Sequence, residues 1–134
     1  YFRFYELEAM WRLGYLEQVL QEIKSYWGGM LRLGAVTFWE EYDPSKPLEQ
    51  QYAMYGDPFG KSLCHAWAAS PIYLLARYFV GIRPLTPGGL TYEAKPQTQF
   101  FRTLDCTFPM GSRQIHISLR DGKVTVISLP YSCL

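Results

Sequence analysis

The spacing of apolar residues changes part-way along this 134-residue chain, and the change limits the folds that it can adopt. Before Gly81 the apolar residues recur at helical intervals, and after Pro87-Gly88-Gly89 they alternate with polar residues at a period of two. Helices and half-buried strands require these different periods. We therefore predict an α+β chain, with a helical segment over 1–84 and a small antiparallel β segment over 85–134.

Two helices are predicted near the start of the chain. Tyr1–Leu13 and Tyr15–Trp27 both have apolar residues at helical spacing, and glycines follow them at Gly14 and Gly28-Gly29. The short link between them predicts an αα-hairpin. Met30–Leu33 is then expected to be a short apolar connection.

A third helix is predicted later in the segment. Ile72–Val80 is apolar nearly all round, which is typical of a buried helix, and Pro71 suits its first turn. Before it, Asp43–Gly60 is polar and rich in proline and glycine. A loop of that length in a compact domain is usually functional.

The β segment is organised around one hairpin. Asp121-Gly122 is a two-residue turn signal between Gln114–Leu119 and Val124–Ser128, which both alternate in polarity. We expect one face of this pair to pack on a core and the other to be wetter. That inner face comprises Ile115, Ile117, Val124 and Val126, and further strands are predicted at Thr91–Ala94 and Phe100–Phe108.

Composition excludes several classes of protein. Apolar residues make up 49% and charged residues 19% of the chain, so a disordered tail is excluded. The net charge of +1 comes from scattered lysines and arginines and gives no basic stripe, so we expect no nucleic-acid partner. Arg77 interrupts the longest apolar run, and a membrane span needs roughly 20 residues. We therefore expect a soluble chain, in a compartment that the sequence leaves open.

The cysteines predict neither a disulfide framework nor a metal site. Cys64, Cys106 and Cys133 are odd in number, widely spaced and contain no C-x-x-C pair. We expect small buried hydrophobic residues, with no metal and no cofactor. The chain begins at Tyr1 without methionine and is helical in pattern from the start, so we expect it to be part of a longer protein.

The stretch 34–43 concentrates acidic and aromatic residues after a glycine. Carbohydrate sites often combine aromatic faces, which pack on a sugar ring, with a carboxylate that accepts a hydroxyl proton or orients water. Charged pairs are more often only surface, so a short helix with a solvated acidic face is the alternative. The residues concerned are Phe38, Trp39, Glu40, Glu41, Tyr42 and Asp43.

Four segments in this order resemble α-L-rhamnosidases and related glycoside hydrolases of the six-hairpin (α/α) barrel type. They are Tyr26–Met30, Gly34–Tyr42, Leu63–Pro71 and Gly81–Pro84, and the similarity covers nearly the whole helical part. The resemblance implies that 1–84 forms the last helical hairpins of a barrel catalytic domain and that 85–134 is a small β-sandwich-like domain. About 45 residues are fewer than a full sandwich of about seven strands would need.

The implied reaction is inverting hydrolysis of a terminal α-L-rhamnosyl bond in a rhamnosylated oligosaccharide or glycoside. One carboxylic acid protonates the leaving oxygen while another carboxylate activates water. The family motif falls on Thr37-Phe38-Trp39-Glu40, so Glu40 is the candidate general base and Glu41 the fallback. The general acid of the family lies in earlier hairpins, so the rest of the parent polypeptide is an implied partner and this chain alone is expected to be inactive.

The same resemblance implies three substrate-binding residues: Trp39, His65 and Trp67. Each also has a structural interpretation, because a lone histidine among apolar residues or a tryptophan on a buried helix is often part of the core. We expect Glu40 and His65 to face one concave surface, lined by Trp39 and the loop Asp43–Gly60. His116 lies on a polar strand face and is assigned no function.

Two other classes of function stay open. A non-catalytic carbohydrate-binding or interaction domain would keep the aromatic surface without turnover. A purely structural helical module is favoured if Glu40, Trp39 and His65 are scattered rather than convergent.

Overall fold

The computed structural model of the chain describes residues 2–130, which form three α-helices and two antiparallel sheets. The predicted α+β class is therefore confirmed. The chain divides into two compact units, Tyr1–Tyr73 and Leu74–Leu134. This division precedes the segment boundary expected at 84/85, and strand β1 (Ile82–Pro84) pairs with a strand beyond that boundary.

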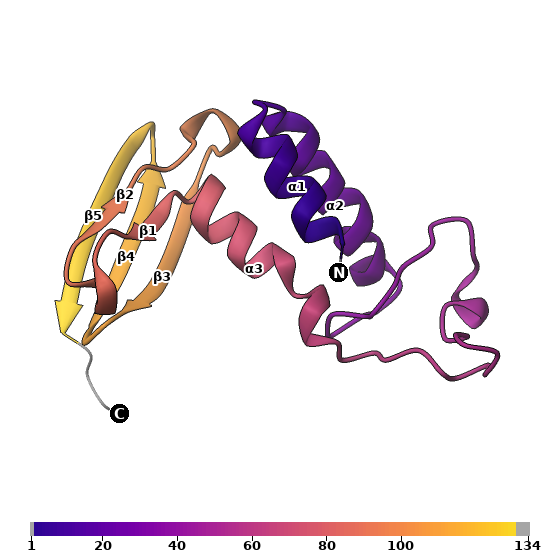
Figure 1. The fold of residues 1–134 in the computed structure, drawn as a ribbon. Coiled ribbons are helices and arrows are strands. Elements are labelled where there is room, and N and C mark those ends of the chain that lie inside the picture. The colour runs from indigo at the N-terminus through magenta and orange to yellow at the C-terminus, as the bar shows by residue number, and fades with distance from the viewer. Residues whose placement is uncertain (1, 131–134) are drawn as a thin grey trace. The chain divides into compact units, whose positions relative to one another are not determined.

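The first unit is built on the predicted αα-hairpin. Helix α1 (Arg3–Arg12) and helix α2 (Leu16–Arg32) lie side by side and run in opposite directions (Figure 1). Apolar residues three and four positions apart place one face of each helix inward. The buried apolar residues of this unit are Leu7, Val19, Ile23, Trp27, Met30, Ala35, Trp39 and Ala68.

The prediction that the second helix ends at Gly28-Gly29 is wrong, because α2 continues to Arg32. The expected connection Met30–Leu33 is therefore mostly helix. The true end is a Schellman motif at Gly34, whose φ is 88°: its N–H bonds to the Leu31 carbonyl, and the Ala35 N–H bonds to the Met30 carbonyl. Gly29 has another role, since a Cβ there would overlap the ring of Tyr42.

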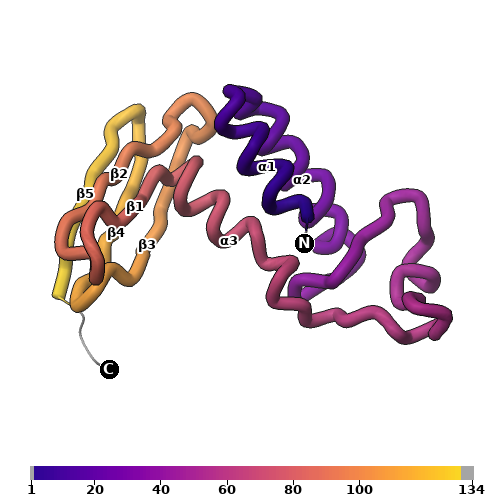
Figure 2. The backbone as a smooth tube through the Cα atoms, in the orientation of Figure 1, coloured from indigo at the N-terminus to yellow at the C-terminus, as the bar shows by residue number. Residues whose placement is uncertain are grey.

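Residues 35–69 form an irregular path that carries the candidate site (Figure 2). The predicted loop over Asp43–Gly60 is confirmed, with one short 3-10 helix at Leu48–Gln50 and an isolated bridge between Met54 and Asp57. A second 3-10 helix spans Ala66–Ala68. The alternative of a short helix over 34–43 is wrong, since these residues form a turn, bends and irregular chain.

The third helix begins as predicted but is less buried. Helix α3 (Ser70–Leu74) carries Pro71 in its first turn and continues as a π-helix over Leu75–Phe79. Leu74 and Phe79 are fully buried, whereas Ile72 is 66% exposed. The prediction of burial all round is therefore wrong for the start of the helix.

The second unit contains both sheets. Strand β1 pairs with β2 (Tyr92–Ala94), and β3 (Leu104–Met110), β4 (Arg113–Arg120) and β5 (Lys123–Pro130) follow one another in a three-stranded antiparallel sheet. The predicted hairpin is confirmed: Asp121 and Gly122 have φ of 50° and 73°, as a two-residue turn of type I′ requires. Strand β1 was not predicted, and β3 begins later than expected because Thr98–Phe100 is a 3-10 turn.

The period of two correctly predicts the inner face of β4 but not that of β5. Ile115 and Ile117 are fully buried and form a core with Val80 and Ile82. Val126 lies on the same face, opposite Ile117, yet it is 39% exposed. β5 is an edge strand, so its side chains have neighbours on one side only.

Candidate functional site

Two stretches of the irregular path lie beside each other and form the frame of the site. The Glu40 N–H donates to the Ser62 carbonyl at 2.9 Å, and the His65 N–H donates to the Phe38 carbonyl at 2.8 Å. The Thr37 hydroxyl donates to the Leu63 carbonyl. These bonds bring together two of the family-like segments that are far apart in the sequence.

The Glu40 carboxylate is oriented through both of its oxygens. Its Oε1 accepts a hydrogen bond from the Tyr55 hydroxyl at 2.8 Å, and its Oε2 accepts one from the Ser62 N–H at 3.2 Å. The Tyr55 hydrogen bond is the main reason that the pKa of Glu40 lies below its usual range, and the Ser62 N–H and the nearby His65 and Lys61 lower it further against partial desolvation. Glu40 is therefore an ionised carboxylate with a fixed direction at neutral pH.

Lys61 is a member of this cluster that the sequence analysis missed. Its side chain is 5% exposed, and its Nζ makes no hydrogen bond with any residue that the structure describes. Burial lowers the pKa of Lys61, while the negative charges of Glu41, Asp43 and Glu40 oppose that shift. A lysine in a polar loop normally extends into water, so the sequence carried no signal of its burial.

His65 joins this polar cluster to an aromatic cavity. The rings of His65 and Trp67 meet edge to face, with centroids 6.1 Å apart. Trp67 is 70% exposed and lines an open cavity of about 560 Å³, together with Phe2, Phe4, Tyr5, Ala66 and Tyr73. His65 therefore lies near the Glu40 carboxylate and against the ring of Trp67, whereas the residues that line the cavity include Trp67 but neither Glu40 nor His65.

Trp39 occupies a different position from the exposed Trp67. It is 4% exposed, and its ring lies 6.2 Å from the ring of Tyr52 in a tilted arrangement. Trp39 is therefore a core residue beside Glu40 in the sequence, with almost no face open to a ligand. Glu41 is half-buried, and its carboxylate accepts no hydrogen bond from the residues that the structure describes.

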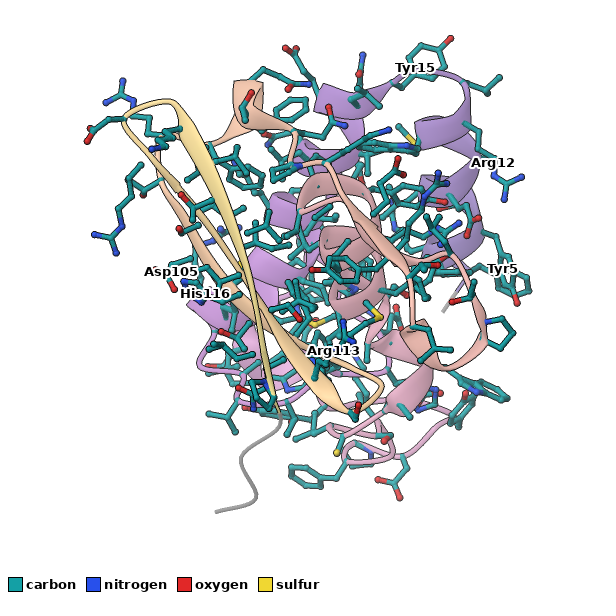
Figure 3. All side chains as sticks on the ribbon, turned by 90° about the vertical axis from the view of Figure 1, so that its left-hand side faces the viewer. Tyr5, Arg12, Tyr15, Asp105, Arg113 and His116 are labelled. Carbon is teal, nitrogen blue, oxygen red and sulfur yellow. The ribbon has the colours of Figure 1, made fainter. Side chains whose placement is uncertain are left out.

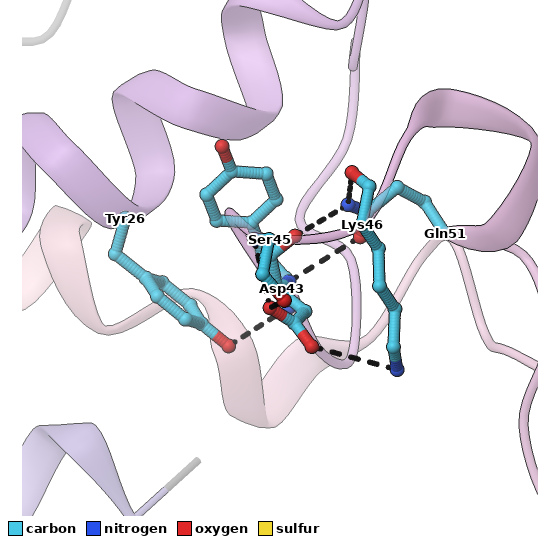
Figure 4. A network of polar contacts seen from close by, with 6 residues as sticks. Tyr26, Asp43, Ser45, Lys46 and Gln51 are labelled. Carbon is cyan, nitrogen blue, oxygen red and sulfur yellow. Dashed lines mark hydrogen bonds and ion pairs between the residues drawn. The ribbon is translucent and has the colours of Figure 1, made fainter.

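A polar network holds the start of the long loop (Figure 4). The side-chain amide of Gln51, which is fully buried, donates to the carbonyls of Asp43 and Lys46 at 2.6 Å and 2.8 Å. The Asp43 carboxylate accepts bonds from the Ser45 hydroxyl and N–H, which lower the pKa of Asp43. The network fixes the backbone just after Glu40 and Glu41.

The same region is attached to helix α2. The Tyr42 N–H donates to the Tyr26 hydroxyl at 3.0 Å, and the Tyr42 ring packs over Gly29. Burial raises the pKa of Tyr26. The Trp27 indole N–H donates to the Ala68 carbonyl at 2.8 Å, so α2 positions both stretches that form the site.

The sheet carries a separate polar pair that lies outside this site. His116 and Asp105 lie on neighbouring strands (Figure 3), with His116 Nε2 and Asp105 Oδ1 3.9 Å apart and Thr107 beside them. Among residues 2–130 no group of three or more His, Cys, Asp or Glu side chains is placed to hold a metal ion. Cys64 and Cys106 are free thiols, of which Cys64 is exposed rather than buried, and Cys133 lies outside the described residues.

Comparison with protein-family models and with curated protein sequences identifies no relative of the chain. No protein-family model matches the chain, and no curated protein sequence matches it significantly. In the described part of the chain, no helix has the length and apolar character needed to cross a membrane. The family resemblance thus depends on the four sequence segments alone.

Chemically, the cluster can do two things. An ionised, oriented carboxylate can accept a proton from a water molecule, and the exposed indole of Trp67 can pack against the apolar face of a ring. His65 lies between these groups and can donate or accept a hydrogen bond.

Proposed function

We propose that the chain is the base-bearing part of an inverting glycoside hydrolase that acts on terminal α-L-rhamnosyl residues. Glu40 is the general base, and His65 and Trp67 contact the sugar. Trp39 supports the Glu40 segment from the core. The substrate is a rhamnosylated oligosaccharide or glycoside.

The observation that carries this proposal is the double hydrogen bonding of the Glu40 carboxylate. A general base of this kind has to be ionised and aimed at the attacking water before the reaction begins. Tyr55 and Ser62 hold one oxygen each, and the lowered pKa keeps the group charged. Each oxygen still has acceptor capacity for a water molecule.

The resemblance also supports a role for a longer polypeptide. In the family, the last helical hairpins of a six-hairpin barrel precede a β-sandwich, and the general acid comes from earlier hairpins. The order of helices and then strands in this chain agrees with such an arrangement. We propose that the rest of the parent polypeptide supplies the acid.

The test is Glu40→Gln in the intact enzyme, with an aryl α-L-rhamnoside as substrate. The amide keeps the shape of the carboxylate but cannot accept the proton of water, so kcat should fall about a hundredfold to ten-thousandfold. Sugar binding should be largely retained, because the loss falls on the transition state. Steady-state kinetics measure kcat and KM separately.

Glu41→Gln is the matched control. It makes the same chemical change one residue along, at a carboxylate without the Tyr55 and Ser62 hydrogen bonds, and should lower kcat far less. Normal turnover in the Glu40 variant, or a larger loss at Glu41, would overturn the assignment of the base.

A second candidate function is non-catalytic carbohydrate binding, favoured by the exposed aromatic cavity beside Trp67. If this candidate is correct, the chain binds a rhamnoside. A titration that is monitored by tryptophan fluorescence measures this binding. Trp67→Ala should abolish binding while Glu40→Gln leaves it intact, with no turnover in the intact polypeptide. Turnover that depends on Glu40 would reject this candidate.

A further inference from the structure

Lys61 places a charged group inside the first unit. Its side chain is 5% exposed, and its Nζ is buried without a hydrogen bond to any residue that the structure describes. The chain's own residues provide this burial, so further polypeptide around the unit can only reduce the exposure. Removing an ammonium group from water is costly unless a nearby opposite charge compensates for it. The position of Lys61 therefore calls for a counter-ion within the first unit.

The backbone hydrogen bonds of the site place Glu41 opposite Lys61. The Glu40 N–H donates to the Ser62 carbonyl, so these two residues lie across from each other on two stretches that run in opposite directions. One step further along, Glu41 lies across from Lys61. The Lys61 N–H donates to the Tyr52 carbonyl at 3.0 Å and so leaves this pair without a backbone bond. Directly opposite side chains of antiparallel stretches lie on the same side and close together.

Of the carboxylates around Lys61, Glu41 is the one that still needs a partner. Burial lowers the pKa of Lys61, and the charge of Glu41 opposes this shift most strongly. Asp43 and Glu40 contribute less. Glu40 is held by the two hydrogen bonds described above, and Asp43 accepts bonds from Ser45. The Glu41 carboxylate accepts no hydrogen bond from the described residues, so its charge remains available to Lys61.

We propose that Lys61 is the counter-ion of Glu41 and that this pair separates the roles of the two adjacent glutamates. Lys61 offsets the charge of Glu41, and Glu40 is left as the carboxylate that acts on water. Neighbouring carboxylates without a cation between them favour protonation of one another. Lys46 also lies near Lys61, but it repels Lys61 and pairs with Asp43 at 3.6 Å. Lys61 is thus a positioning residue that acts through Glu41.

The pairing of Lys61 with Glu41 stands on the contacts above, whereas its consequence for catalysis rests on the proposed function of Glu40. The experiments therefore measure the pairing without turnover and the consequence with it.

NMR titration of the Lys61 side chain in the full chain tests the pairing. Isotope-labelled lysine gives signals that follow protonation, and Lys61→Met identifies the signal of Lys61. Backbone-based assignment replaces this step if the variant does not fold. In Glu41→Gln the pKa of Lys61 should fall further, because the strongest opposing charge is lost. Glu49→Gln is the matched control: Glu49 is an exposed glutamate of the same loop, and its loss should leave the Lys61 titration unchanged.

The titration of Glu40 gives a second measurement. Besides the Tyr55 hydrogen bond, the charge of Lys61 helps to lower the pKa of Glu40. Lys61→Met removes that charge and leaves Glu41 unmatched, so the pKa of Glu40 should rise. The double variant Lys61→Met with Glu41→Gln should return it toward the value of the unchanged chain. A lysine that only filled space would give no such recovery, since the second substitution would then add to the first.

In the intact enzyme, the acidic limb of kcat/KM should shift in the same order as the Glu40 titration. At neutral pH the loss of kcat in Lys61→Met should stay well below the roughly hundredfold minimum expected for Glu40→Gln, because the base itself is retained.

The outcomes separate this inference from the proposed function. A Lys61 titration that does not change in Glu41→Gln, or that changes equally in Glu49→Gln, would overturn the pairing whatever the kinetics show. A Lys61 titration that shifts as expected, together with turnover that does not depend on Glu40, would confirm the pairing and overturn the assignment of Glu40 as the base.

Discussion

The site segment and the β4-β5 hairpin are stabilised in different ways. Residues 35–69 have almost no regular structure, and their positions depend on individual polar contacts such as those of Gln51 and Tyr55. The hairpin has a regular ladder of paired residues and a buried face around Ile117. The candidate chemistry lies entirely in the irregular part.

This difference is what a functional site requires. Regular elements bury apolar residues at a fixed period, which leaves little freedom to aim a carboxylate in a chosen direction. An irregular segment can present Glu40 and His65 side by side, provided that other groups satisfy its backbone. Side chains of helix α2 and the amide of Gln51 provide these groups, because they form hydrogen bonds with the backbone of the irregular segment.

The largest effect is expected from the buried face of the sheet. Ile117→Ala removes a fully buried side chain and should lower the free energy of unfolding of the second unit by about 2–5 kcal/mol. Val126→Ala, on the facing position of β5, should cost less than about 1 kcal/mol, because its neighbours cover it on one side only.

The measurement has to report on the second unit alone. The four tryptophans, Trp11, Trp27, Trp39 and Trp67, all lie in the first unit, so amide hydrogen exchange of β4 is the suitable probe. Equal losses in the two variants would mean that β5 is covered as well as β4, and would remove the contrast between these strands.

A smaller loss is expected from the polar frame of the site. Gln51→Ala leaves the carbonyls of Asp43 and Lys46 without their buried donor, which should cost about 1–3 kcal/mol. The neighbouring Gln50 is exposed, so Gln50→Ala should change stability by less than about 0.5 kcal/mol. Urea unfolding followed by tryptophan fluorescence measures both. Similar values for the two variants would show that the loop is not held by the Gln51 amide.

The sequence predicted the regular elements better than the site, for a physical reason. The hairpin at Asp121-Gly122 follows from local turn chemistry and a period of two, and both are visible in adjacent residues. The end of α2 was misplaced because Gly28-Gly29 resembles a helix stop, whereas Gly29 makes room for Tyr42, a residue in another element. Close approach between distant residues leaves no local pattern.

The composition of the site shows the same limit. The resemblance named Glu40, Trp39, His65 and Trp67, and in the structure His65 lies near the Glu40 carboxylate and beside the ring of Trp67. It did not indicate Tyr55, Ser62 or Lys61, whose contacts with Glu40 arise only when the long loop folds back. Nor did it show that Trp39 is buried while Trp67 is exposed, since both lie among apolar neighbours.

The smallest effect on stability, and the most informative one on chemistry, is expected from Tyr55→Phe. Tyr55 is 82% exposed, so the free energy of unfolding at neutral pH should change by less than about 0.5 kcal/mol. The pKa of Glu40 should rise toward the ordinary range of a glutamate, because its main stabilising hydrogen bond is lost.

The sign of the pH effect follows from the lowered pKa of Glu40. A carboxyl group whose folded-state pKa lies below the unfolded value stabilises the fold above the unfolded pKa, and this contribution is lost as the pH falls through the folded pKa. In Tyr55→Phe this contribution to stability is smaller and its loss is complete at a higher pH, and the acidic limb of kcat/KM in the intact enzyme should move to higher pH. Titration of the glutamate carboxyl carbons by NMR measures the shift directly, with Tyr52→Phe as the control, since the Tyr52 ring packs on Trp39 instead. An unchanged Glu40 titration would show that the hydrogen bond does not hold the carboxylate, and the irregular segment would then lack the polar fixation that distinguishes it from the sheet.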